Sequence, residues 1–257
     1  MSDKKTLRVL SIDWDFFQIV DKKTLMMSYP DGVDLGGEIS QFVWQQYYSN
    51  PYHKDRLSAV TIDTKKLHQL ENALYLNAMD HLPDAMICNS HKNIYDFIIN
   101  RCSKDGYSEI NIDHLDMHHD MINSNKELDC GNWISHLKEK YPTHVTWIAN
   151  PISKSVYNLD EEDKFDIIRE DLIELVNRRW DLVFLCRSDS WTPPHLDKHF
   201  VDLANFLSMI CANTTQVEKG ILDSRWTDEY IKSIEVMSKE LEKMRINATC
   251  GGDLSFD

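Results

Sequence analysis

The sequence predicts an α/β protein in which a mainly parallel sheet lies between helices, a three-layer αβα arrangement. Short apolar runs rich in β-branched residues alternate along the 257 residues with longer segments of helical periodicity. Because a helical segment separates most successive runs, the strands should be joined by crossovers and lie parallel. No repeat, low-complexity tract or linker divides the chain, so residues 1–257 are expected to form a single domain.

The apolar runs predict strands over Leu7–Ile12, Asp84–Cys88, Glu109–Ile112, His144–Ala149 and Asp181–Cys186. The amphipathic segments predict helices over Glu38–Tyr48, Lys65–Met79, Lys92–Arg101, Asn132–Lys140, Asp160–Arg179, Leu196–Cys211 and Thr227–Met244. Leu57–Ile62 fits either state. Turn residues at Pro30-Asp31-Gly32 and Leu35-Gly36-Gly37 mark a loop between the first strand and the first helix.

Composition is typical of a cytoplasmic enzyme. Hydrophobic residues make up 42% of the chain and can form a substantial core. The formal charge of −14 argues against nucleic-acid binding, which needs a basic face, and favours metal ions or a cationic substrate. The N-terminus lacks the apolar segment of a signal peptide, and no stretch is long and apolar enough to cross a membrane. The six cysteines are scattered without a Cys-x-x-Cys pair, so no disulfide framework or zinc knuckle is expected.

Charged residues with metal-binding side chains follow two of the predicted strands. Asp13 and Asp15 follow the first strand, and Asp116, His118 and Asp120 follow Glu109–Ile112. Residues two apart in an extended segment project to the same side, and sites in parallel sheets lie at the carboxyl ends of the strands. Buried carboxylates at this density need a cation to neutralise them. The sequence therefore predicts a pair of divalent metal ions.

His91, which follows the strand Asp84–Cys88, is the natural sixth ligand, although a single histidine is more often a polar residue with local partners. A ligand set rich in oxygen with few imidazoles favours manganese, or iron or cobalt, over a structural zinc. Taken alone, Asp13 would equally fit a helix cap. His119 is expected to point away from the metals. With His114 and His195 it is a candidate donor of a proton to a leaving group.

The motifs Asp116-x-His118-x-Asp120 and Ser11-x-Asp13-x-Asp15 resemble the metal motifs of the ureohydrolases, which include arginase and agmatinase. The run Cys88-Asn89-Ser90-His91 and the element Asp13-Trp14-Asp15-Phe16-Phe17 resemble an arginase-like family that includes bacterial peptide arginases. Two features depart from arginase. The Ser-x-Asp-x-Asp motif comes first here rather than last, which a circular permutation would explain, and the Gly-Gly-Asp-His-Ser context is absent around His91.

The resemblance implies an arginase/deacetylase-like fold, whose motif order a circular permutation would explain, with two Mn²⁺ ions in each chain. It implies one ion bound by His91, Asp116, Asp120 and Asp13, and a second bound by His118, Asp15 and the bridging Asp116 and Asp13. The implied reaction converts arginine residues of a peptide, such as a ribosomal natural-product precursor, to ornithine with release of urea. Two cations that share a water lower its pKa, and Asp120 would orient that water as a catalytic residue, with His119 as the candidate acid.

A guanidinium substrate needs a planar carboxylate partner, and Asp189, after the strand Asp181–Cys186, is predicted to provide it. A cap for the helix that begins near His195 is an equal alternative for Asp189. Trp191 would stack on the arginine by a cation–π contact, or simply pack in the core.

Four other functions remain open. Asp13-Trp14-Asp15 and Gly252-Asp253-Leu254-Ser255-Phe256-Asp257 resemble motifs of haloacid-dehalogenase-type phosphatases, but that assignment leaves Asp116-x-His118-x-Asp120 without a role. A free arginine or agmatine ureohydrolase would use the same chemistry on a small substrate. A deacetylase would use a single zinc ion and fewer carboxylates. A binding module could keep the metals without turnover.

Overall fold

The computed structural model describes residues 5–30, 34–122, 126–156 and 166–250, and its centre is a seven-stranded sheet in the order β7-β6-β5-β1-β8-β4-β9. Every neighbouring pair in this sheet is parallel. Its strands are β1 (Thr6–Asp13), β4 (Asp84–Cys88), β5 (Glu109–Asp116), β6 (Thr143–Ala149), β7 (Ile167–Arg169), β8 (Leu182–Cys186) and β9 (Asn213–Gln216). The predicted α/β fold with a parallel sheet is confirmed.

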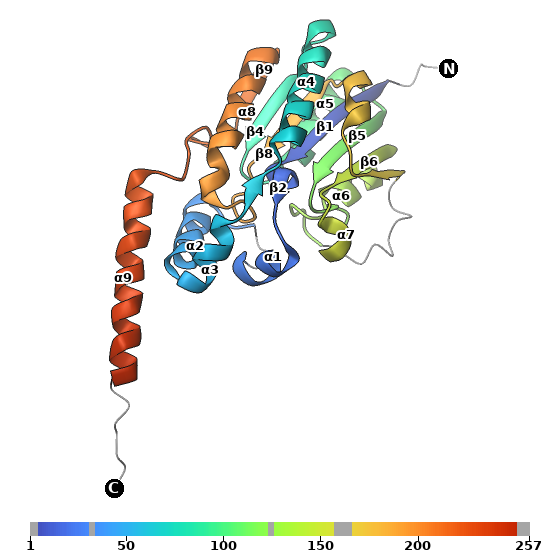
Figure 1. The fold of residues 1–257 in the computed structure, drawn as a ribbon. Helices are drawn as coiled ribbons and strands as arrows, with labels where there is room; N and C mark the ends of the chain where they lie inside the picture. Colours follow the sequence, from blue (N-terminus) through green and yellow to red (C-terminus); the bar gives the residue numbers. More distant parts are fainter. Residues whose placement is uncertain (1–4, 31–33, 123–125, 157–165, 251–257) are drawn as a thin grey trace.

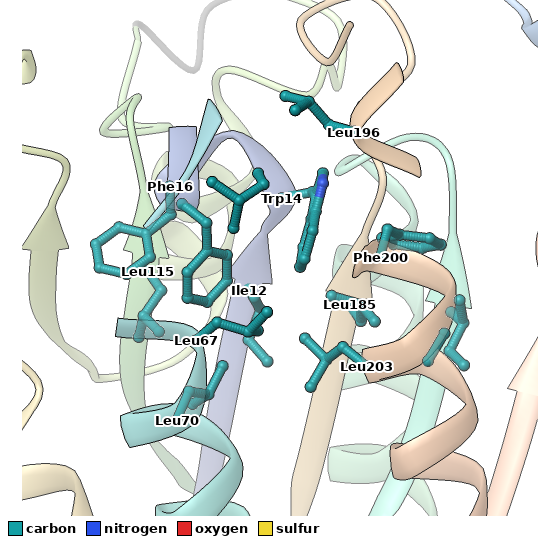
Figure 2. Close-up of a cluster of buried hydrophobic side chains, with 14 of the residues drawn as sticks. Ile12, Trp14, Phe16, Leu67, Leu70, Leu115, Leu185, Leu196, Phe200 and Leu203 are labelled. Atoms are coloured by element: carbon teal, nitrogen blue, oxygen red, sulfur yellow. The ribbon is translucent and has the colours of Figure 1, made fainter. Parts of the chain in front are cut away.

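Helices cover both faces of the sheet (Figure 1). Helices α4 (Thr64–Asp80) and α8 (Asp197–Ile210) pack on one face, where Leu67, Leu70, Phe200 and Leu203 meet the side chains of β1, β5 and β8 (Figure 2). Helices α5 (Asn93–Asp105) and α6 (Trp133–Lys140) pack on the other face. The three-layer αβα arrangement follows from these two hydrophobic cores, one on each side of the sheet.

Most of the remaining elements lie near the carboxyl ends of the strands, whereas η3 packs against α4. The 3₁₀ segment η1 (Trp14–Phe17) continues directly from β1, and β2 pairs antiparallel with β3. Helix α9 extends away from the sheet (Figure 1). The bounds are β2 (Gln18–Ile19), α1 (Lys22–Ser28), α2 (Gly37–Ser49), α3 (Pro51–Ser58), β3 (Thr61–Ile62), α7 (Ser153–Val156), η3 (Ile173–Asn177), η4 (Pro194–Leu196) and α9 (Asp228–Cys250).

The helix predicted over Asp160–Arg179 is wrong in its described part. Residues 160–165 lie outside the described residues, and the rest forms the short strand β7 and the 3₁₀ segment η3. Ile167 and Ile168 are β-branched, and their strand β7 pairs in parallel with β6 at the edge of the sheet. This pairing overrides the helical periodicity of the apolar residues in the sequence. Strand β9 was not predicted because its sequence Asn-Thr-Thr-Gln is polar throughout.

Candidate metal centre

The predicted metal ligands converge at the carboxyl ends of three strands. Asp13 and Asp15 come from β1 and η1, the run Asp116–Asp120 begins at the last residue of β5, and His91 follows β4. Strand β1 pairs with β5 on one side and β8 on the other, with β4 next to β8. Because these strands are parallel, their carboxyl ends share one edge of the sheet. Of the six predicted ligands, all are buried except His118, which is partly exposed.

The ring of His91 faces three carboxylates at once. Its Nδ1 lies 3.0 Å from Asp13 Oδ2, 3.2 Å from Asp116 Oδ2 and 3.3 Å from Asp120 Oδ2. One ring nitrogen carries at most one hydrogen, so hydrogen bonding cannot satisfy three carboxylate oxygens. The ring itself is held in place, because Phe184 stacks on it at 5.3 Å between centroids. Oxygens and a nitrogen that converge in this way form a donor set for a cation.

A second donor group adjoins the first and shares a residue with it. His118 Nδ1 lies 2.9 Å from Asp15 Oδ2 and 3.4 Å from Asp116 Oδ1. The backbone N–H of Met117 donates to Asp15 Oδ1 at 3.0 Å and fixes that carboxylate. Asp116 thus presents Oδ2 to His91 and Oδ1 to His118. A carboxylate that faces two neighbouring donor groups can bridge two cations.

His114, a residue not predicted as a ligand, lies in the same cluster. Its Nε2 is 3.4 Å from Asp116 Oδ2 and 3.8 Å from Asp120 Oδ2, and its side chain is fully buried. Strand β5 continues to Asp116, so His114 and Asp116 project to the same side of the sheet. The alternation His114-x-Asp116-x-His118 was the signal in the sequence that could have found it.

The electrostatics of the cluster favour a positive charge among its carboxylates. Burial, together with the charges of Asp13 and Asp116, raises the pKa of Asp15 to about 8. Burial and Asp116 also raise the pKa of Asp120 well above its ordinary value. Burial lowers the pKa of His114 to about 3, so its ring is neutral, as a metal ligand must be. Bound cations would lower the pKa values of these carboxylates and so stabilise their ionised forms.

Three buried atoms of the cluster lack a hydrogen bond of good geometry in the described part of the chain: Asp15 Oδ2, His114 Nε2 and Asp116 Oδ2. Buried polar atoms without partners are rare in folded proteins and need an explanation. The ligand atoms of His91, His114, Asp116 and Asp120 lie within 4.8 Å of one another, and so do those of Asp15, Asp116 and His118. These buried histidines and aspartates can hold a metal ion.

Two residues of the site have left-handed backbone conformations. Asp120 and Ser188 both have φ of 50°, and they are the only non-glycine residues with positive φ in the described chain. The indole Nε1 of Trp133 donates to Asp120 Oδ2 at 2.6 Å, and the Ser188 hydroxyl donates to Asp13 Oδ2. Conformations of this kind persist where surrounding contacts hold them, and they cluster at functional sites.

Asp189 does not occupy the position that its predicted role requires. Arg187 Nε donates to its Oδ1 at 2.5 Å and Arg187 Nη2 to its Oδ2 at 3.2 Å. Arg225 lies 3.5 Å from the same Oδ1, and the Asp189 side chain is buried. The chain's own guanidinium groups already bind this carboxylate, which corrects the prediction that it binds the guanidinium of a substrate. The sequence does not show that Arg225 folds back onto it.

Trp191 and His119 lie on the wall of a cavity of about 510 Å³ that also reaches His91, His118 and Asp120. The Trp191 ring is 5.9 Å from that of His118. The structure therefore places both residues beside the metal centre. His195 does not line this cavity, because its ring bonds to Tyr48 and to the Val60 carbonyl.

Comparisons with known proteins give no relative for this chain. No family model matches it, and no curated protein and no solved structure resembles it at a significant level. The likeness to arginase-type motifs therefore remains a prediction from the motif residues. The phosphatase-like run Gly252–Asp257 lies outside the described residues. Within the described chain, none of the helices has the length and apolar character needed to span a membrane.

Proposed function

We propose that this chain is a hydrolase with two manganese ions that converts arginine residues of a peptide to ornithine and releases urea. The observation that carries this proposal is the shared carboxylate of Asp116, which faces His91 with one oxygen and His118 with the other. Two adjoining donor groups with a common carboxylate are the arrangement expected of a site for two ions. Their oxygen-rich composition supports manganese.

The ligand assignment follows the contacts. His91, Asp13, Asp116 and Asp120 would hold one ion, since all three carboxylates surround His91 Nδ1. Asp15, His118 and Asp116 would hold the second. When bound, such a pair of ions lowers the pKa of a water that they share, which supplies a nucleophile near neutral pH.

The reaction is a hydrolysis at the guanidinium carbon. Water adds its oxygen to that carbon, the bond from the carbon to the chain nitrogen breaks, and the chain nitrogen takes a proton and leaves as the ornithine amine. Asp120, on the cavity wall, is assigned to accept a hydrogen bond from the attacking water. His119 Nδ1 accepts the backbone N–H of Met121 at 3.0 Å, so its exchangeable proton is held at Nε2. We propose that His119 transfers this Nε2 proton to the leaving nitrogen.

The cavity supports a substrate larger than free arginine. Apolar side chains of Leu25, Met26 and Ile122 line it beside the metal cluster, and Met26 and Ile122 are exposed. This apolar part of the cavity wall fits the flanking residues of a peptide better than the charged amino and carboxyl groups of a free amino acid. Trp191 offers a ring face to a guanidinium or its aliphatic stem.

The test is urea release from the manganese-loaded protein with three substrates in parallel: free arginine, agmatine and an unstructured peptide that contains arginine. We expect urea from the peptide, with ornithine at the arginine position by mass spectrometry. Asp120→Asn should abolish the signal while circular dichroism stays unchanged, and Asp202→Asn, on an exposed helix face, should leave it intact. Urea from the small molecules alone would overturn the peptide assignment. No urea from any substrate, with two ions bound, would overturn the reaction.

A further inference from the structure

The far sides of two imidazole rings in the metal cluster meet at one hydroxyl group. Ser11 Oγ lies 2.8 Å from His91 Nε2 and 3.3 Å from His114 Nδ1. Each ring turns its other nitrogen toward the carboxylates, His91 with Nδ1 and His114 with Nε2. A single buried side chain thus contacts both rings from behind.

The strand register produces this arrangement. Ser11 of β1 is the Cα partner of His114 in β5, and on its other side it is the partner of Phe184 in β8. Phe184 stacks on the His91 ring, which brings His91 over the central strand from the loop after β4. Ser11 therefore has His114 beside it in β5. On its other side it has Phe184 of β8, with the ring of His91 stacked on it.

The nitrogen of His114 that faces the cluster lies near two carboxylates without a well-aligned hydrogen bond to either. His114 Nε2 is buried and makes no hydrogen bond of good geometry, although Asp116 Oδ2 and Asp120 Oδ2 lie 3.4 and 3.8 Å away. A nitrogen that carried a hydrogen at this position would be expected to bond to one of these carboxylates. A lone pair directed at a cation among the same carboxylates explains both the distances and the missing hydrogen bond.

We propose that His114 is a ligand of the same metal ion as His91, and that Ser11 holds both rings in the tautomers that bind it. A serine hydroxyl oxygen has two lone pairs, so it can accept a hydrogen from His91 Nε2 and one from His114 Nδ1. Acceptance of both hydrogens leaves His91 Nδ1 and His114 Nε2 with free lone pairs toward the ion. Ser11 is then a positioning residue that acts through the two rings.

This inference goes beyond the six ligands assigned above, and it rests on the proposed metal site but not on the proposed reaction. With His114 as a ligand, the two ions differ in the number of their imidazole ligands. The ion near His91 would have two imidazole ligands, whereas the ion near His118 would have one. Because the ion near His91 would have three carboxylates and two imidazoles around it, and the ion near His118 two carboxylates and one imidazole, the site near His91 should fill first.

The direct test is the tautomer of each histidine by ¹⁵N NMR on the wild-type protein loaded with Zn²⁺, a diamagnetic substitute. We expect hydrogens on His91 Nε2 and His114 Nδ1 and metal-shifted signals for His91 Nδ1 and His114 Nε2. A hydrogen on His114 Nε2 in the loaded protein would overturn the proposal. This measurement needs neither a variant nor an active enzyme, so its failure is separate from a failure to release urea.

Manganese affinity gives the second readout. Ser11→Ala should weaken the tighter Mn²⁺ site by about 10–100-fold, the usual effect of losing a group that orients a ligand. His114→Gln should weaken it at least as much. The matched control is Ser28→Ala, because the Ser28 hydroxyl also bonds to a histidine ring, His53 Nδ1 at 3.1 Å, outside the metal cluster. Equal Mn²⁺ affinity in Ser11→Ala and in the control would contradict the role of Ser11.

Discussion

Two buried clusters of charge lie side by side at the carboxyl ends of the strands, and they are neutralised in different ways. In the first, Asp189 and Asp197 are paired with Arg187 and Arg225. In the second, the metal cluster, the basic side chains that contact Asp15, Asp116 and Asp120 are all histidines among the described residues. The carboxylates of both clusters are almost fully buried. Burial alone therefore does not distinguish them.

The pKa shifts of Asp189 in the first cluster and of Asp15 and Asp120 in the second have opposite directions. Asp116 of the second cluster differs, because burial is outweighed by the hydrogen bonds of His118 and His91, which lower its pKa. Burial would raise the pKa of Asp189, but Arg225 and Arg187 outweigh it and lower that pKa. Burial raises the pKa of Asp15 to about 8 because no guanidinium opposes it. The arginine cluster carries its own guanidinium cations and is a structural element, whereas the metal cluster has only imidazoles as basic groups and can accept a metal ion. This difference predicts which substitutions will abolish function and which will unfold the protein.

The largest effect is expected for Asp116→Asn, which removes the carboxylate common to both donor groups. Loss of metal stabilisation in the transition state costs several kcal/mol, and each 1.36 kcal/mol is a factor of ten in rate, so urea release should fall by about 10³ or more. Bound manganese should fall in parallel when measured by elemental analysis. Full metal content with normal activity would show that Asp116 is not a bridge.

The arginine cluster should respond in the opposite way. Arg225→Met leaves the buried Asp197 without the guanidinium that lies 2.7 Å from its Oδ1, and the carbonyl of Thr192 loses a donor at 2.8 Å. Breaking a buried ion pair from one side typically costs about 3–5 kcal/mol of unfolding free energy. Denaturant titration should show this loss, and added manganese should not restore it selectively.

The control for Arg225→Met is Lys198→Met, because the Lys198–Asp202 pair is exposed at 2.9 Å. Exposed pairs contribute about 0–1 kcal/mol. If the two substitutions cost the same, the arginine cluster would not be the internal support that its geometry indicates.

Metal removal is the third comparison. Because the folded cluster binds the ions and the unfolded chain lacks the assembled site, manganese at 100 times its Kd should stabilise the wild-type protein by about 2.7 kcal/mol. Asp116→Asn should lose most of this manganese-dependent increment. Arg225→Met should keep it, although its unfolding free energy without manganese is lower than that of the wild type. A manganese effect of equal size in wild type and Asp116→Asn would place the stabilising ion elsewhere.

The sequence predicted the metal cluster better than the arginine cluster, for a physical reason. Alternation with period two and the common edge of parallel strands are local rules, and they were enough to bring Asp13, Asp15 and the run Asp116–Asp120 together. His114 was missed because β5 extends further than its apolar residues indicate, so a ligand lies inside the strand.

Asp189 was assigned the wrong role because its partner is distant in the chain. Arg225 precedes α9, 36 residues after Asp189, and no local pattern predicts that it donates to the backbone carbonyl of Asp189 at 3.0 Å. A buried aspartate looks the same in sequence whether its cation comes from the protein or from solution. The helix predicted over Asp160–Arg179 failed similarly, since pairing with β6 is a tertiary contact.

The smallest effect is a pH dependence at the edge of the arginine cluster. His195 precedes Asp197 by two residues, and burial lowers its pKa. Its neutral ring fits both neighbours, with Nε2–H donating to the Val60 carbonyl at 2.9 Å and Nδ1 accepting from the Tyr48 hydroxyl. Because the folded pKa lies below the unfolded value of 6.5, the unfolded chain binds more protons below that pH. Its contribution to stability is therefore complete above pH 6.5 and is lost as the pH falls toward the folded pKa.

His195→Gln isolates this contribution, since a glutamine can offer an N–H to Val60 and an oxygen to Tyr48 without titrating. Unfolding free energies of the two proteins should converge or cross as the pH falls from 7.5 to 5, with the wild type losing more. Loss of metal from the neighbouring cluster in acid affects both proteins equally and cancels in the difference. Parallel curves would show that His195 titrates alike in the folded and unfolded chain. Such a result would also mean that the stability of the arginine cluster does not depend on the charge of the ring beside it.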